Sequence, residues 1–176
     1  MWVFGYGSLV WRPGFDEAER VPGFVRGFTR RFWQASTDHR GVPDYPGRVV
    51  TLLDDDPDAI TWGVASRVRD ERVDAVLADL DYREKGGYAR HHTTVHTADG
   101  GTIDDVLVYV AGPTNPCFVG EEPIDVIADR VVRAVGPSGP NTEYVLRLAD
   151  ALRDMGVQDP HVFALDRAVR ARLAER

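Results

Sequence analysis

The sequence predicts an α+β fold, with mostly antiparallel strands early in the chain and helices packed around them late in it. Three observations predict this class. Runs rich in β-branched residues, bounded by Gly, Pro or Asp, recur as far as residue 111. The dipeptide Asp99-Gly100 separates two of these runs and is a hairpin signal. After Pro123 the apolar residues recur at helical spacing instead.

The strands are expected in six extended segments. The first is the apolar start of the chain, residues 1–4. Residues 24–34 (FVRGFTRRFWQ) are rich in aromatic residues and arginine, and we expect them to be extended rather than helical. The four remaining runs cover residues 47–53, 60–68, 91–97 and 103–111. Because the last two flank Asp99-Gly100, we expect them to pair as antiparallel neighbours.

Four helices are expected. Asp70 can cap the first, which ends before Gly86-Gly87. Pro123 lies near the start of the second helix. Asn141 can cap the third helix, and Gly156 can end it. The fourth helix runs from about Pro160. We expect their apolar faces to be core: Val73, Val76, Leu77 and Leu80; Ile124, Ile127, Val131 and Val135; Val145, Leu148, Leu152 and Met155; Val162, Leu165, Val169 and Leu173.

Length and composition favour one soluble domain spanning residues 1–176. The chain has no 18-residue apolar run and no N-terminal secretion signal, so we predict no membrane span and no processing. The single cysteine, Cys117, excludes an internal disulfide and indicates a reducing, cytoplasmic compartment. A net charge of −7 argues against nucleic acid as a partner.

The stretch FGYGSL, residues 4–9, turns sharply or lets another group approach closely, because it holds two glycines. It lacks the third glycine of a dinucleotide fingerprint, the Gly-x-Ser-x-Gly of a nucleophile elbow and the Gly-Lys of a phosphate loop. From this stretch alone, a β-turn closing a buried first strand is the favoured interpretation, ahead of a binding loop.

The stretch LDYREKGGY, residues 80–88, places four ionisable side chains at the end of the first helix. A solvated helix end accounts for them by composition. However, Glu84 meets the negative end of the helix dipole, which is unfavourable unless the carboxylate has another purpose. A raised carboxyl pKa, useful for proton transfer, is one such purpose.

Two loops and the histidines complete the candidates. Residues 36–48 form a long polar loop containing Arg40 and Arg48, and residues 136–144 lead into a helix N-terminus that favours an anion. His92 and His96 lie in a strand-like segment and not on a helix as an i,i+4 pair, and no cysteine pair accompanies them, so we predict no metal site and no cofactor. Cys117 has no neighbouring base and fits a small buried residue better than a nucleophile.

Four stretches together resemble the ChaC family of glutathione-specific γ-glutamylcyclotransferases: YGSL at 6–9, RRFWQASTDHRGVPDYPGRVVTL at 30–52, LDYREKGGY at 80–88 and GPSGPNTEY at 136–144. The resemblance implies a small antiparallel β-barrel, closed or nearly so, with helices outside and a pocket at its mouth. It implies conversion of glutathione to 5-oxoproline and cysteinylglycine. It also implies a catalytic role for Glu84, substrate binding by Val3, Phe4, Gly5, Tyr6, Gly7, Ser8 and Leu9, and a pocket position for Tyr144.

This chemistry fits the residue types. A γ-glutamyl group carries its own nucleophile, an α-amine with a pKa of about 8, so near neutral pH it needs a base such as Glu84. The glycine loop can hold the substrate bent and stabilise the oxyanion. We hypothesise that Arg40 or Arg48 binds the glycine carboxylate of glutathione.

Two other functions are compatible with the sequence. One is a cyclotransferase for other γ-glutamyl compounds, which would share Glu84 and the glycine loop. The other is a non-catalytic, ligand-binding regulator, which would have no use for a base at residue 84. The sequence does not predict the oligomeric state.

Overall fold

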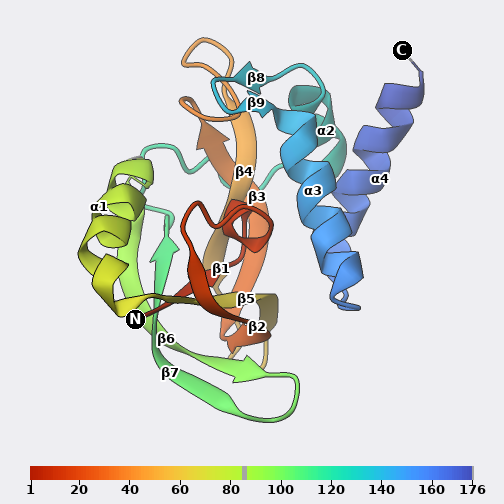
Figure 1. The fold of residues 1–176 in the computed structure, drawn as a ribbon. Helices are drawn as coiled ribbons and strands as arrows, with labels where there is room; N and C mark the ends of the chain where they lie inside the picture. The colour runs from red at the N-terminus through yellow and green to blue at the C-terminus, as the bar shows by residue number, and fades with distance from the viewer. Residues whose placement is uncertain (85–86, 176) are drawn as a thin grey trace. The chain divides into compact units, whose positions relative to one another are not determined.

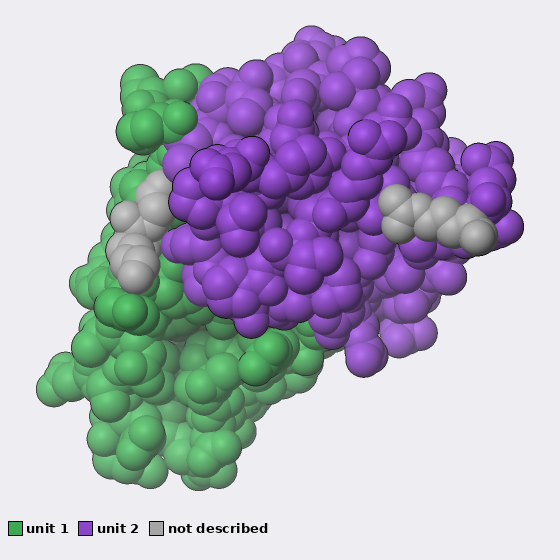
Figure 2. Space-filling view, turned by 90° about the horizontal axis from the view of Figure 1, so that it is seen from above, with its two compact units in different colours: residues 1–29, 52–116 green, residues 30–51, 117–176 purple. Residues whose placement is uncertain are grey.

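The protein, described by a computed structural model over residues 1–84 and 87–175, forms two compact units, coloured separately in Figure 2. The first unit comprises residues 1–29 and 52–116, and the second comprises residues 30–51 and 117–176. Strands β3 (Phe28–Ser36) and β4 (Gly47–Asp54), which pair as a two-stranded sheet, each run from one unit into the other. That the whole chain is a single domain stays a prediction.

The first unit is built on a closed five-stranded barrel (Figure 1). Around the barrel the strands follow the order β1 (Trp2–Gly5), β5 (Ile60–Val68), β2 (Glu17–Arg26), β6 (Ala89–Thr97) and β7 (Thr102–Val110). Neighbours are antiparallel except at the closure, where β1 pairs with β7 in parallel through Val3 and Leu107. The predicted α+β class and small barrel are therefore confirmed.

The turn chemistry of the barrel strands is partly as predicted. Strands β6 and β7 form the expected antiparallel hairpin, and Gly100 at its turn has a φ of 87°. The extended segment expected at 24–34 is instead divided, because Gly27 adopts a φ of 76° between β2 and β3. Most of β2 lies before Phe24 and was not anticipated.

Helix α1 (Val73–Arg83) packs on the barrel of the first unit. Its buried residues Val76 and Leu80 join a cluster with barrel residues Val3, Val68, Leu107 and Tyr109. The expected cap at Asp70 is wrong, because a 3₁₀ turn, η2 (Asp70–Arg72), comes first and the carbonyl of Asp70 accepts from the Val73 N–H. At the other end Gly87 has a φ of 91°, whereas Gly86, the other expected stop residue, lies outside the described residues.

Within its described residues, 30–51 and 117–175, the second unit contains three helices, α2 (Ile124–Val131), α3 (Asn141–Asp154) and α4 (Pro160–Ala174), with α4 packed against both others. The predicted apolar faces of α3 and α4 are fully buried at Val145, Leu148, Leu152, Val162, Leu165 and Val169, but Met155 is only partly buried and Leu173, at the end of α4, is 38% exposed. Val135, however, lies beyond the end of α2 in the short strand β8 (Val135–Gly136), which pairs with β9 (Gly139–Pro140), and it is 59% exposed. Within residues 1–84 and 87–175, no helix combines the length and apolar character that a membrane span requires.

Asn141 is buried and does not cap α3. Pro140 occupies the N-cap position, and Asn141 is the first residue of the helix. Its Oδ1 accepts from the main-chain N–H of Arg48 (2.6 Å), and its Nδ2 donates to the Arg48 carbonyl (2.8 Å). The polar side chain expected to cap the helix therefore joins it to β4.

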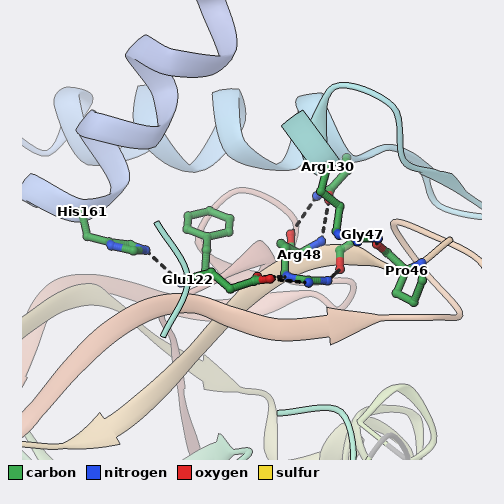
Figure 3. Close-up of polar contacts among 8 residues, drawn as sticks. Pro46, Gly47, Arg48, Glu122, Arg130 and His161 are labelled. Atoms are coloured by element: carbon green, nitrogen blue, oxygen red, sulfur yellow. Dashed lines mark hydrogen bonds and ion pairs between the residues drawn. The ribbon is translucent and has the colours of Figure 1, made fainter. Parts of the chain in front are cut away.

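The start of α4 is joined to β3 by polar contacts of Asp159 and His161. Asp159 caps the helix by accepting from the Val162 N–H and also accepts from the Nε of the buried Arg30 (2.9 Å). His161, visible in Figure 3, accepts from the main-chain N–H of Phe32 through Nε2 (3.0 Å). A buried imidazole that accepts a hydrogen bond at Nε2 is held in its neutral form.

We expect His161 to make this unit sensitive to acid. Burial, assisted by the positive charge of Arg31, lowers the pKa of His161 to about 4 from 6.5. Below pH 6.5 the unfolded chain takes up a proton at this histidine, whereas the folded chain does not until the pH approaches 4. The contribution of His161 to the free energy of unfolding is therefore fully present above pH 6.5, and the free energy of unfolding falls by up to about 3 kcal/mol as the pH drops to about 4. Urea denaturation at pH 7 and pH 4.5 tests this, with His161→Gln as the comparison. The variant retains an acceptor for Phe32 but does not titrate, so an equal loss in both proteins would contradict the assignment.

Candidate active site

The glycine loop, residues 4–9, leaves the end of β1 in the first unit and enters a 3₁₀ turn, η1 (Ser8–Val10). A Cβ atom on Gly5 would lie 2.6 Å from the Cβ of Leu9, so only glycine allows this tight return. Gly7 precedes η1, and its carbonyl accepts from the Val10 N–H (3.0 Å). The loop is therefore a compact turn at one end of a barrel strand.

The side chains of the glycine loop are mostly committed to holding it in place. Val3 and Phe4 are each 1% exposed and belong to the core. Tyr6 is also buried, and its hydroxyl donates to the main-chain carbonyl of Tyr109 (2.8 Å). Of the predicted binding residues, Ser8 offers a side-chain hydroxyl to a ligand, whereas Val3 and Phe4 lie within β1, where they pair with β5.

Glu84 lies immediately after α1, in the C-cap position. Its N–H donates to the Leu80 carbonyl (2.8 Å), and its own carbonyl accepts from the Tyr88 N–H (3.2 Å). The Glu84 side chain is 20% exposed, so a small molecule can reach it from solvent. Leu80, Tyr88 and Leu9 belong to one apolar cluster, so the packing that positions Glu84 also positions the glycine loop.

Arg83 contacts both of these elements directly. Its Nη2 donates a short hydrogen bond to the Ser8 hydroxyl oxygen, and its Nε lies 3.6 Å from Oε1 of Glu84. The structure therefore brings together the glycine loop and the predicted base, which are far apart in the sequence. Arg83 itself received no role from sequence reasoning, since no local pattern encodes a contact across 75 positions.

A polar chain behind the glycine loop fixes the tyrosine that anchors it. Tyr109 donates from its hydroxyl to Oδ1 of Asp81 (2.7 Å), and Asp81 also accepts from Arg90. Burial and the bond to Asp81 raise the pKa of Tyr109 to about 12, whereas the hydrogen bond from Arg90 lowers the pKa of Asp81. Tyr109 therefore remains a hydrogen-bond donor at neutral pH, and its main chain provides the acceptor for Tyr6.

The remaining predicted site residues, Arg40 and Tyr144, belong to the second unit. Arg40 is 5% exposed, and its Nη1 donates to Oε2 of Glu143 (2.9 Å) and to the Pro140 carbonyl (3.1 Å). Its guanidinium lies 5.9 Å from the centre of the Tyr144 ring, which packs edge-on against Phe32. Arg40 and Tyr144 thus form one buried group at the start of α3.

Arg48, the other arginine considered for substrate binding, has a structural partner. Its Nε and Nη2 donate to the two carboxylate oxygens of Glu122 at 2.6 and 3.0 Å, and its Nη1 donates to the Gly47 carbonyl (Figure 3). Such a two-point pair is strong and directional. Arg130 donates to the Pro46 carbonyl beside it, so these contacts brace the end of the 36–48 loop. Arg40 also pairs with a carboxylate, but its contact with Glu143 runs through Nη1 and is not of this two-point kind, so Arg40 is the better candidate for binding a ligand.

The polar groups of the first unit are suited to proton transfer and to oxyanion binding. Glu84 supplies a carboxylate, and Ser8 supplies a hydroxyl beside the glycine loop. Among the residues that the structure describes, no group of three or more His, Cys, Asp or Glu side chains is placed to hold a metal ion.

Comparison with known proteins identifies close relatives. The family model described as ChaC-like protein matches residues 1–172. Glutathione-specific γ-glutamylcyclotransferase 1 from Mus musculus is 48% identical over 176 residues, covering 96% of this chain and 78% of its own. γ-Glutamylcyclotransferase 2-3 from Arabidopsis thaliana is 42% identical, covering 99% and 91%. A crystal structure of a glutathione-specific γ-glutamyl cyclotransferase from yeast aligns with a TM-score of 0.91 at 32% identity, covering 97% and 96%.

Proposed function

Because this chain belongs to the ChaC-like protein family, we propose that it is a glutathione-specific γ-glutamylcyclotransferase, which cleaves glutathione into 5-oxoproline and cysteinylglycine. The observation that carries the proposal is the meeting of Ser8, Arg83 and Glu84 in the first unit. The similarity to relatives that are named for this activity, at 48% identity in the mouse protein, supports the choice of substrate.

The proposed reaction is an intramolecular aminolysis. The α-amine of the γ-glutamyl group attacks its own γ-carbonyl, forming the C–N bond of a five-membered ring, and the amide C–N bond to cysteine breaks. Glu84 accepts a proton from the amine and returns one to the departing nitrogen, so no water or cofactor is consumed. Because the nucleophile is part of the substrate, the chain must supply only a base, an oxyanion site and a bent substrate conformation.

The glycine loop is suited to the last two tasks. The absence of a side chain at Gly7 lets main-chain N–H groups of the loop approach the substrate, and donors of this kind stabilise a developing oxyanion. Ser8 adds a hydroxyl on the side nearest to Arg83 and Glu84. Tyr6 holds the loop to β7 through Tyr109.

Mass spectrometry of the purified protein with reduced glutathione tests the proposal. We expect 5-oxoproline and cysteinylglycine in equal amounts. If folded protein releases neither, γ-glutamyl-amino acids become the next substrates to test. No product from those compounds would overturn the enzymatic proposal and favour a ligand-binding regulator.

We assign selectivity for glutathione to Arg40, which the second unit holds buried beside Tyr144. If its guanidinium binds the glycine carboxylate, Arg40→Ala should lower the preference for glutathione over γ-glutamyl-alanine roughly 10- to 100-fold, the value of a charged hydrogen bond. The ratio of kcat/KM for the two substrates measures this. Glu143→Gln is the control, since it breaks the Arg40 ion pair but keeps the guanidinium. An unchanged ratio in folded Arg40→Ala would remove Arg40 from the site.

We further propose that the chain acts as one cytoplasmic domain on this small-molecule substrate. The family model spans nearly the whole chain, which supports a single domain. The lone cysteine fits a reducing compartment, and a net charge of −7 disfavours nucleic acid and anionic membrane surfaces.

A further inference from the structure

Arg83 occupies a position that the proposed reaction does not by itself explain. It is the last residue of α1, and its side chain is 28% exposed. Nη2 of the guanidinium donates to Ser8, and Nε lies near Glu84. Nη1 lies near Gly14: a Cβ atom built on Gly14 would be 3.6 Å from it. One side chain therefore touches the glycine loop, the proposed base and a neighbouring turn.

The contact with Ser8 determines what the serine hydroxyl can do. A hydroxyl has one hydrogen to donate and two lone pairs, whereas a guanidinium only donates. The bond from Arg83 occupies one lone pair of Ser8, so the hydroxyl hydrogen must point to a different group. A hydrogen bond from a cation also polarises the hydroxyl and strengthens it as a donor.

The contact with Glu84 is of a different kind. At 3.6 Å, the Nε–Oε1 distance is that of an ion pair and is too long for a hydrogen bond. The attraction holds the Glu84 carboxylate near the same guanidinium that donates to Ser8. It also opposes the unfavourable field of the helix C-terminus at this position.

We infer that Arg83 is a positioning residue. It fixes the Ser8 hydroxyl as a donor to an oxygen of the γ-glutamyl group, and it holds this hydroxyl and the Glu84 carboxylate in a fixed relative position. Its effect on turnover rests on the proposed function. Its effect on the glycine loop does not, because the bond to Ser8 joins two side chains of the protein itself.

A double-mutant cycle with Ser8 tests the role in turnover. Arg83→Met should lower kcat about 10- to 100-fold with a smaller change in KM, because the Ser8 donor is needed most as the oxyanion forms. Ser8→Ala should cost a similar factor, and the double variant should be little worse than either single variant. Arg83→Lys, which keeps one donor and the charge, should recover part of the rate. Arg67→Met is the matched control: it removes an exposed arginine–carboxylate pair of similar length from the same unit, to Glu19, and should leave kcat within about twofold.

Hydrogen exchange measures the positioning without any reaction. In Arg83→Met, but not in Arg67→Met, we expect faster amide exchange across residues 4–11, with unchanged exchange in the β6–β7 hairpin. Multiplicative losses in the Ser8 cycle, or unchanged exchange in the loop, would overturn the inference. If wild-type protein does not cleave glutathione, the proposed function fails while the exchange result still decides whether Arg83 positions the loop. If Arg83→Met does not fold, Arg83→Lys replaces it in both measurements.

Discussion

Replacing Glu84 with glutamine is expected to lower the rate of 5-oxoproline release from glutathione by roughly 10²–10⁴-fold, the usual worth of a positioned general base. Glutamine preserves the size of the side chain but cannot accept the proton of the substrate ammonium group. Main-chain bonds from Glu84 to Leu80 and Tyr88 do not involve the side chain, so the helix end should persist. Steady-state rates by mass spectrometry, with thermal unfolding of both proteins, provide the measurement.

The matched control for this prediction is Glu71→Gln. Glu71 is an exposed carboxylate in η2, at the other end of the same helical segment, so its neutralisation changes the net charge equally. We expect its rate to stay within about twofold of wild type, as for surface substitutions generally. A folded Glu84→Gln variant that keeps more than one tenth of the wild-type rate would show that another group takes the proton.

The parts of the fold that sequence predicted are those set by local patterns. The β6–β7 hairpin follows from alternation around Asp99-Gly100, and the helix cores follow from apolar spacing such as Val145, Leu148 and Leu152. Local patterns also misled: the stripe ending in Val135 ran past the end of α2, because two short strands begin there. Spacing records which residues share a helical face, but it does not record where the helix stops.

The candidate site likewise contains residues that the sequence predicted and contacts that it did not. Glu84 and the glycine loop were identified through family resemblance, and Gly5 has a steric reason that the structure makes explicit. The contacts that position them, from Arg83 to Ser8 and from Tyr6 to Tyr109, join residues 75 and 103 positions apart. Barrel closure creates these contacts, and no periodicity in the sequence contains them.

Asn141 shows how one residue type can serve two structural roles that sequence does not distinguish. Asparagine before a helix normally caps it, and aspartate does so equally well. Here the side chain is fully buried and uses both a donor and an acceptor on the main chain of Arg48. Only an amide satisfies both contacts, because a carboxylate has no hydrogen to offer the Arg48 carbonyl.

Asn141→Asp therefore separates the two roles. A cap predicts an unchanged or slightly greater free energy of unfolding, since a negative charge suits a helix N-terminus. The two observed hydrogen bonds between Asn141 and the Arg48 main chain, here called the bridge, predict a different result. The free energy of unfolding should fall by about 3 kcal/mol at pH 7, because a buried carboxylate would face the Arg48 carbonyl with no hydrogen between them.

Urea denaturation measures this loss, and Thr142→Asp is the control, because it places the same charge in the first turn of α3 outside the bridge. The loss in Asn141→Asp should shrink as the pH falls toward 4, since a protonated carboxyl can donate to the Arg48 carbonyl as the amide does. Equal stability of Asn141→Asp and wild type at pH 7 would contradict the bridge.

Because Arg48 also braces the 36–48 loop through Glu122, the loss of stability should extend to the loop that carries Arg40. Faster amide exchange in that loop, beyond the change seen in Thr142→Asp, is the expected sign that one buried amide joins the helix and the proposed selectivity loop.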